Sequence, residues 1–123
     1  MNIPSVLIVE DDEWLAEQYS RALKGSGYQV SIVPHALAAI QKIDDSCPDA
    51  IILDVLLTGS TAFALLNELQ SYGDTGKIPI ILCTNMASEL SIDNLKLYGV
   101  KQIIDKTTMG PGDLALALQD VLS

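Results

Sequence analysis

Four kinds of polar side chain stand at separated points of this sequence, each directly after an apolar stretch. An acidic run occupies positions 10–12, and Asp54, Thr84 and Lys106 close three later stretches. Together they would supply a carboxylate nucleophile, oxygen ligands for a divalent cation, a hydroxyl and an ammonium group. A phosphoryl group in transfer needs this set for charge stabilisation, so the residues point to phosphoryl chemistry if the fold brings them together.

The acidic run has two readings, because carboxylates at the start of a helix also interact favourably with the helix dipole. We assign that role to Asp12 and Glu13. The remaining carboxylates would repel one another beside Asp54 unless a cation compensates for their charge. An all-oxygen ligand set suits the hard, octahedral Mg²⁺ ion. The pairing of the run with Asp54 therefore favours a magnesium site.

Short apolar runs alternate with segments of helical period, a pattern that predicts strand–helix pairs around a parallel sheet. Strands are expected at 6–9, 28–32, 50–53, 80–83 and 102–105, and helices at about 13–24, 35–44, 61–71, up to 98, and from 111 onward. The first, third and fourth strands are apolar throughout, as strands covered on both faces are, so the other two should be edges. The order 2-1-3-4-5 meets this requirement with right-handed crossovers and brings the polar strand ends to one rim.

Helical periodicity also predicts which helix side chains point inward. These are Leu15, Tyr19, Ala22 and Leu23 in the first helix, Leu37, Ile40 and Ile43 in the second, and Leu114, Leu118, Val121 and Leu122 in the last. Gly99 is expected to end the fourth helix as a left-handed cap.

Length and composition indicate one domain, residues 1–123, with a hydrophobic core of its own. Cys47 and Cys83 are expected to be reduced thiols. No apolar run approaches the roughly 18 residues of a membrane span, and a signal peptide is lacking, so we expect a soluble cytoplasmic protein without membrane contact. Sixteen acidic against seven basic residues give a net charge of −9, which argues against direct nucleic-acid binding.

An acidic pair, an aspartate, a threonine and a lysine at successive strand ends resemble the receiver domains of response regulators in two-component systems. The resemblance covers essentially the whole chain, and it includes the stretch 48–54, which leads to Asp54. It implies a doubly wound (βα)5 flavodoxin-like α/β sandwich similar to chemotaxis regulators. It further implies a phosphoprotein of phosphorelay signal transduction, with Asp54 as phosphoacceptor, Thr84 as switch hydroxyl and Lys106 as phosphate contact.

By the same resemblance, Mg²⁺ would bind the carboxylates of Asp11 and Asp54 and the backbone carbonyl of Leu56, while Glu10 orients metal-bound water. The phosphoryl donor would be a phosphohistidine on a histidine kinase or phosphotransfer protein. The chain would then not be an enzyme in the usual sense, because it catalyses only its own aspartyl phosphorylation and dephosphorylation. A downstream protein would bind the face made by the fourth helix, fifth strand and fifth helix. The kinase, the input signal, homodimer formation and membership of a larger regulator are left open.

Five positions depart from that family's pattern. Thr58 and Thr107 stand where proline is usual, and Ala62 stands where glycine is usual. Asn85 replaces a small residue, and Ile103 replaces an aromatic residue that rotates inward on activation. A cis bond before a threonine would cost roughly 2.5–4 kcal/mol, so we expect the bond from Lys106 to Thr107 to be trans. The departures keep open a pseudo-receiver that acts as an interaction module without phosphorylation.

Two enzyme or cofactor alternatives are weaker. A Mg²⁺-dependent phosphohydrolase typically carries D-x-D after its first strand, whereas positions 10–12 read Glu-Asp-Asp, and the chain is short for a cap domain. An FMN-binding protein of the same strand order needs a Ser/Thr/Gly-rich phosphate loop there, and the acidic run argues against it.

Overall fold

The chain folds into a five-stranded parallel sheet with helices on both faces. A computed structural model describes residues 3–54, 62–71, 75–85, 87–110 and 112–122. The strands are β1 (Ser5–Val9), β2 (Gln29–Val33), β3 (Ala50–Leu53), β4 (Ile80–Thr84) and β5 (Val100–Asp105). The α-helices are α1 (Glu13–Gly25), α2 (Ala36–Asp45), α3 (Ala62–Gln70), α4 (Ile92–Leu95) and α5 (Asp113–Leu122). Short 3₁₀ turns are η1 (Thr75–Lys77), η2 (Ala87–Glu89) and η3 (Lys96–Tyr98).

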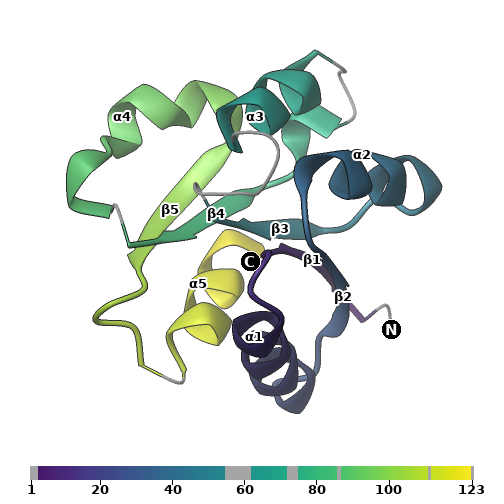
Figure 1. Ribbon diagram of the computed structural model, residues 1–123, viewed down its shortest axis with the longest axis vertical. Coiled ribbons are helices and arrows are strands. Elements are labelled where there is room, and N and C mark those ends of the chain that lie inside the picture. The colour runs from purple at the N-terminus through teal and green to yellow at the C-terminus, as the bar shows by residue number, and fades with distance from the viewer. Residues whose placement is uncertain (1–2, 55–61, 72–74, 86, 111, 123) are drawn as a thin grey trace.

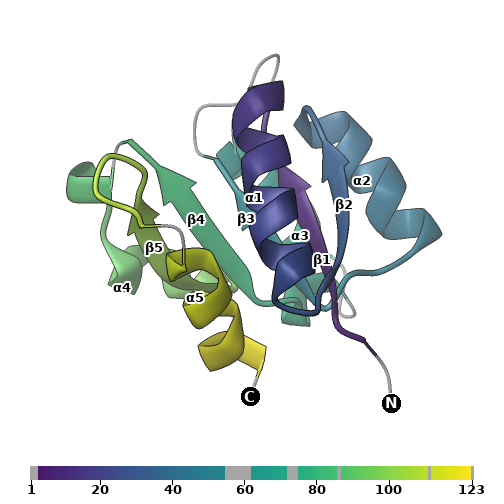
Figure 2. The ribbon, with the colours of Figure 1, turned by 90° about the horizontal axis from the view of Figure 1, so that it is seen from below.

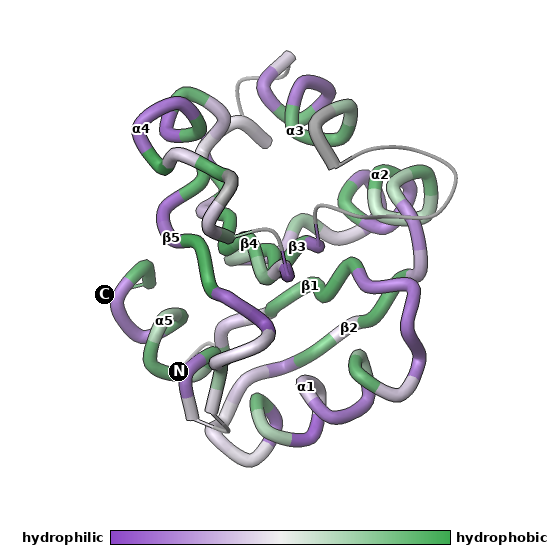
Figure 3. Tube along the Cα trace, turned by 60° about the vertical axis from the view of Figure 1, so that its left-hand side comes forward, coloured by the Kyte–Doolittle hydropathy of each residue, from purple (hydrophilic) through white to green (hydrophobic). Residues whose placement is uncertain are grey.

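The sheet order is β2-β1-β3-β4-β5, and all pairs are parallel, which confirms the predicted topology and flavodoxin-like class. The edge strand β2, which mixes polar and apolar residues, differs visibly in hydropathy from β1, which is apolar from Val6 to Val9 (Figure 3). Because the central strands are covered on both faces, every residue of β3 and β4 is buried.

Helices α1 and α5 cover one face of the sheet, while α2, α3 and α4 cover the other (Figures 1 and 2). Because successive side chains of a strand point to opposite faces of the sheet, alternate residues lie in the two hydrophobic cores. Ile8, Ile52 and Ile81 pack against α1 and α5, whereas Leu53 and Leu82 pack on the opposite side. The sheet is thus fixed from both sides, and its strand ends are held in one register.

Helix ends largely follow local side-chain chemistry. Asp12 is the N-cap of α1, and its Oδ1 accepts a hydrogen bond from the backbone N–H of Leu15 at 3.1 Å. His35 caps α2 in the same way, because its Nδ1 accepts from the N–H of Ala38. Gly99 has φ +84°, the left-handed conformation expected of it.

The predicted inward face of α2 was wrong at Leu37, whose exposed fraction is 62%. The buried residues of α2 are Ala36, Ala39 and Ile43. Each residue turns a helix by about 100°, so a face that contains Ala36 places Leu37 well to one side. Ile43 is buried and Ile40 is partly buried, as predicted, so counting large apolar residues failed only at Leu37 and missed the two buried alanines.

The single helix expected before Gly99 is divided into η2, α4 and η3. Ser91, between η2 and α4, has extended backbone angles of φ −112° and ψ 120°, which a continuous helix excludes.

Cys47 is exposed and Cys83 is buried, and no disulfide joins them, as expected. Among the described residues, none of the helices combines the length and apolar character that crossing a membrane requires.

Candidate functional site

The carboxyl ends of four neighbouring strands place the predicted residues along one rim of the sheet. Glu10 follows β1, Asp54 follows β3, Thr84 ends β4 and Lys106 follows β5. Backbone hydrogen bonds continue the sheet through these positions. The N–H of Asp54 donates to the carbonyl of Val9 at 3.3 Å, and the N–H of Lys106 donates to that of Thr84 at 3.0 Å. The parallel sheet therefore aligns residues that are distant in sequence.

Three carboxylates converge at this rim. One oxygen each of Glu10, Asp11 and Asp54 lies within 4.8 Å of the others. Glu10 and Asp54 are buried, and Asp11 is exposed to solvent. Such an all-oxygen donor set, open on one side, fits Mg²⁺, which keeps several water ligands and takes few carboxylates.

Lys106 bridges two of these carboxylates. Its Nζ donates to Asp54 Oδ2 at 2.9 Å and also to Glu10 Oε1. The lysine side chain is only 10% exposed, so this ion pair is largely shielded from water. Glu10 Oε2 is buried and has no hydrogen-bond partner within the described part of the chain. Among the described residues, the Lys106 ammonium contacts two of the three clustered carboxylates, and a divalent cation would compensate for the remaining negative charge.

Burial and the neighbouring opposite charge have opposite effects on the pKa values of Glu10 and Lys106. Burial raises the pKa of Glu10, and the hydrogen bond from Lys106 does not fully offset that effect. Burial by itself would lower the pKa of Lys106, but hydrogen bonds and Coulombic attraction from Glu10 and Asp54 outweigh it and raise this pKa. Lys106 therefore remains an ammonium at neutral pH.

The other predicted positions differ in what the structure shows of them. Thr84 is fully buried and lies opposite Asp105 in the β4–β5 register. Ile103 is partly buried against the core on the α2–α4 side. Asn85 is exposed directly after Thr84. Leu56 and Thr58, the predicted carbonyl ligand and one departure from the pattern, lie outside the described residues.

The bond from Lys106 to Thr107 is trans, as expected, since the described residues contain no cis peptide bond. Asp105 was not among the residues predicted from sequence, but its carboxylate accepts hydrogen bonds from the backbone N–H and the hydroxyl of Thr107. An Asp-x-Thr sequence after a strand signals such a turn and would have identified it.

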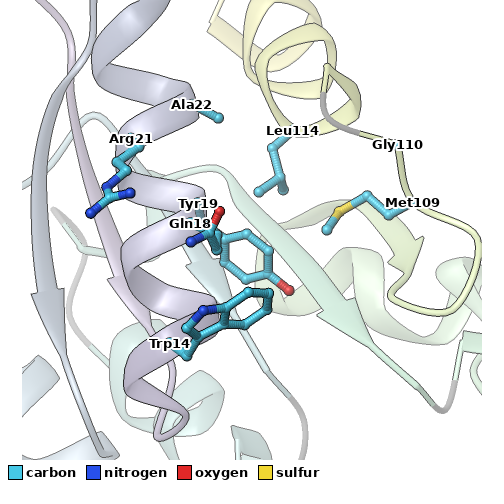
Figure 4. A pocket seen from close by; sticks show the side chains of 8 residues that line it. All are labelled: Trp14, Gln18, Tyr19, Arg21, Ala22, Met109, Gly110 and Leu114. Atoms are coloured by element: carbon cyan, nitrogen blue, oxygen red, sulfur yellow. The ribbon is translucent and has the colours of Figure 1, made fainter.

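A groove of about 600 Å³ lies between α1 and the start of α5 (Figure 4). Its apolar lining includes Trp14, Tyr19, Met109 and Leu114. Trp14 is 68% exposed, although large aromatic side chains usually bury most of their area.

The side chain of Cys83, in β4, contacts two residues that line this groove. Cys83 Sγ lies 3.8 Å from both Tyr19 Oη and Met109 Sδ. Burial raises the pKa of the Cys83 thiol to about 11, so it remains protonated and serves packing.

Comparison with known proteins agrees with this geometry. The family model for the response regulator receiver domain matches residues 6–119. The sensory transduction protein RegX3 of Mycobacterium bovis is 31% identical over 86 residues, which are 70% of this chain and 37% of that protein. The chain thus spans little more than a third of the curated relatives it matches.

Solved structures show the same fold. The signal receiver domain of a histidine kinase from Syntrophus aciditrophicus is 30% identical with a TM-score of 0.82, covering 97% of this chain and 89% of that one. The receiver domain of the sensor histidine kinase PA1611 from Pseudomonas aeruginosa, solved with a magnesium ion coordinated in its active site cleft, is 22% identical with a TM-score of 0.86, covering 98% of both chains. With the family model matching nearly its whole length, this chain belongs to the response regulator receiver domains of two-component signalling systems.

Proposed function

We propose that this chain accepts a phosphoryl group on Asp54 in a Mg²⁺-dependent reaction and passes the signal on through its surface. The convergence of Asp54 with Glu10, Asp11 and Lys106 at one rim carries the proposal. Residues 1–123 would form one receiver unit acting in the cytoplasm. A protein partner, a histidine kinase or a histidine phosphotransfer protein, would supply the phosphoryl group.

In the proposed reaction, a carboxylate oxygen of Asp54 attacks the phosphorus of the phosphohistidine. The new O–P bond forms as the N–P bond breaks, and the imidazole leaves with the bonding electron pair. Lys106, already 2.9 Å from Asp54 Oδ2, would direct an N–H toward a phosphoryl oxygen. Thr84 would donate its hydroxyl to another phosphoryl oxygen. These contacts place positive charge where the transition state is most negative.

The metal would be held by Asp11 and Asp54, with Glu10 orienting a water ligand and the Leu56 carbonyl as a further proposed ligand. The buried Glu10 Oε2, which has no hydrogen-bond partner among the described residues, supports this assignment, because a water ligand would satisfy it. When bound, Mg²⁺ supplies neutralisation of the phosphoryl charge.

Acetyl phosphate tests the proposal without a protein partner. We expect wild-type protein incubated with acetyl phosphate and Mg²⁺ to gain the mass of one phosphoryl group, with the modified peptide containing residue 54. Excess EDTA should prevent the gain. No mass gain with acetyl phosphate or any phosphorylated kinase tried would instead favour the pseudo-receiver alternative.

The groove is the proposed docking place for the phosphohistidine donor. Met109 lies three positions after Lys106, so a partner packed there would lie beside the rim that carries Asp54. A histidine side chain is short, so its protein must approach the rim closely to reach a buried carboxylate. Exposed Trp14 and the apolar lining resemble the anchors that dominate protein interfaces.

Trp14→Ala should slow transfer from a protein donor by about thirtyfold or more, because loss of a central aromatic anchor commonly costs at least about 2 kcal/mol. Transfer from acetyl phosphate should stay within about twofold of wild type, since a small donor needs no groove. The donor is the phosphorylated kinase that reacts fastest with wild type in a panel. Leu37→Ala, an equally exposed apolar residue on α2, is the control. Equal slowing by both variants, or slowing with acetyl phosphate, would contradict the docking assignment.

The output surface is proposed on the α4-β5-α5 face. Leu97, in η3 directly after α4, is 84% exposed and would offer an apolar contact to a downstream protein. Ile103 has no ring to rotate, so any change of this surface would have to proceed through the backbone of β4 and β5 instead.

A further inference from the structure

The chain reverses sharply after β5, and the reversal contains Lys106. The backbone N–H of Thr108 donates to the carbonyl oxygen of Asp105 at 3.3 Å, which closes a four-residue turn. The carboxylate of Asp105 closes the same turn again. Its Oδ1 accepts from the N–H of Thr107 at 2.8 Å and from the Thr107 hydroxyl at 2.6 Å. Asp105 thus forms an Asx-turn with the residue two positions later.

Lys106 is the first inner residue of this turn, and its backbone is fixed on both sides. On the strand side, its N–H donates to the carbonyl of Thr84 at 3.0 Å. On the other side, the hydrogen bonds between Asp105 and Thr107 restrain it. Its side chain then extends inward to Glu10 and Asp54.

Fixing this backbone matters because a lysine side chain has several rotatable bonds and loses much conformational freedom when ordered. A free reversal would allow the ammonium to leave the carboxylates for water. A proline after the lysine would restrict the chain covalently, but Thr107 has no ring. The Thr107 hydroxyl and N–H provide a hydrogen-bonded restraint at the same place.

We propose that Asp105 and Thr107 are positioning residues that hold the Lys106 ammonium over Asp54 through the Asx-turn, in place of a proline. The inference rests on the proposed function, because it assigns Lys106 to the phosphoryl group. Two features agree with it. Both side chains are accessible enough to be replaced without disturbing the core. The hydrogen bonds from the Thr107 hydroxyl and N–H also lower the pKa of Asp105, so its carboxylate stays charged as an acceptor.

Three variants isolate the Thr107 hydroxyl. Thr107→Val keeps the branched shape and removes the hydroxyl donor, whereas Thr107→Ser keeps a hydroxyl. Thr108→Val is the control, because it makes the same threonine-to-valine change at the next residue. Thr108 is exposed and takes part in the turn through its backbone N–H. We expect Thr107→Val to slow phosphorylation by acetyl phosphate roughly tenfold, the effect of losing one hydrogen bond to a charged group. Thr107→Ser and Thr108→Val should remain within about twofold of wild type.

NMR spectroscopy shows whether the Lys106 ammonium is held in place, independently of the phosphorylation rate. The ¹H–¹⁵N NMR signal of the Lys106 ammonium, protected in wild type by its two carboxylate partners, should broaden or vanish in Thr107→Val and return in Thr107→Ser. The double variant Asp105→Ala/Thr107→Val should be no slower than Asp105→Ala, because both changes remove the same hydrogen bond between Asp105 and Thr107. Equal rates and ammonium signals in Thr107→Val and wild type would overturn the inference, as would additive losses in the double variant. If wild type takes up no phosphoryl group, the proposed function fails, and the ammonium signal still decides whether Asp105 and Thr107 position Lys106.

Discussion

We expect the Asp54→Asn variant to gain no phosphoryl mass from acetyl phosphate in the presence of Mg²⁺, whereas wild type should gain the mass of one phosphoryl group. The amide has neither the charge nor the nucleophilic oxygen needed to form an acyl phosphate. Unfolding should not explain the loss. Asp54 is one of three crowded carboxylates, and neutralising one of them relieves repulsion.

The control is Asp44→Asn, which removes the same charge from an exposed position on α2. It should be phosphorylated at the wild-type rate. Intact mass after fixed times, with circular dichroism to confirm folding, makes the comparison. Phosphorylation of Asp54→Asn at an undiminished rate would assign the acceptor to another residue and remove the basis of the proposed reaction.

Saturating Mg²⁺ should stabilise the wild-type fold. Because only the folded chain brings the three carboxylates together, a Mg²⁺ concentration one hundred times the Kd should add about 2.7 kcal/mol to the free energy of unfolding. For a domain of this size that is a rise in Tm of about 10 °C. Thermal melts with Mg²⁺ and with EDTA measure the difference.

Asp11→Asn should lose most of that stabilisation together with Mg²⁺-dependent phosphorylation. Asp11 is exposed, so its replacement leaves the core intact. Glu13→Gln, an exposed neutralisation two positions later, should keep the full response. Fluorescence of Trp14, the single tryptophan, provides a second titration signal close to the site. An equal Tm shift in Asp11→Asn and wild type would place the ion elsewhere.

Local patterns determined much of this fold. The apolar runs of β1, β3 and β4 predicted central strands because a strand covered on both faces cannot carry polar residues. Asp12, placed at a helix start by its charge, lies there and also caps the helix, and Gly99 took the left-handed conformation expected of it. These features depend on interactions within a few residues, which a sequence displays directly.

The full buried face of α2 was less accessible to sequence, although Ile40 and Ile43 were placed on it correctly. The buried face of α2 consists mainly of alanines, and Leu37 stays exposed because α3 and β2 meet the helix from another side. The interruption at Ser91 was missed for a related reason, since apolar spacing alone does not reveal a single extended residue within a helical segment.

By itself, the sequence determined the strand order and therefore that Glu10, Asp54, Thr84 and Lys106 share one rim. Strand order follows from burial and crossover handedness, and the carboxyl ends of parallel strands must meet. Only the tertiary structure decided how those groups are connected. It joined Lys106 to Glu10 and Asp54 at once and left Glu10 Oε2 without a hydrogen-bond partner among the described residues. It also opened a groove between α1 and α5. Such contacts depend on side-chain directions and packing between distant segments, and no local pattern encodes them.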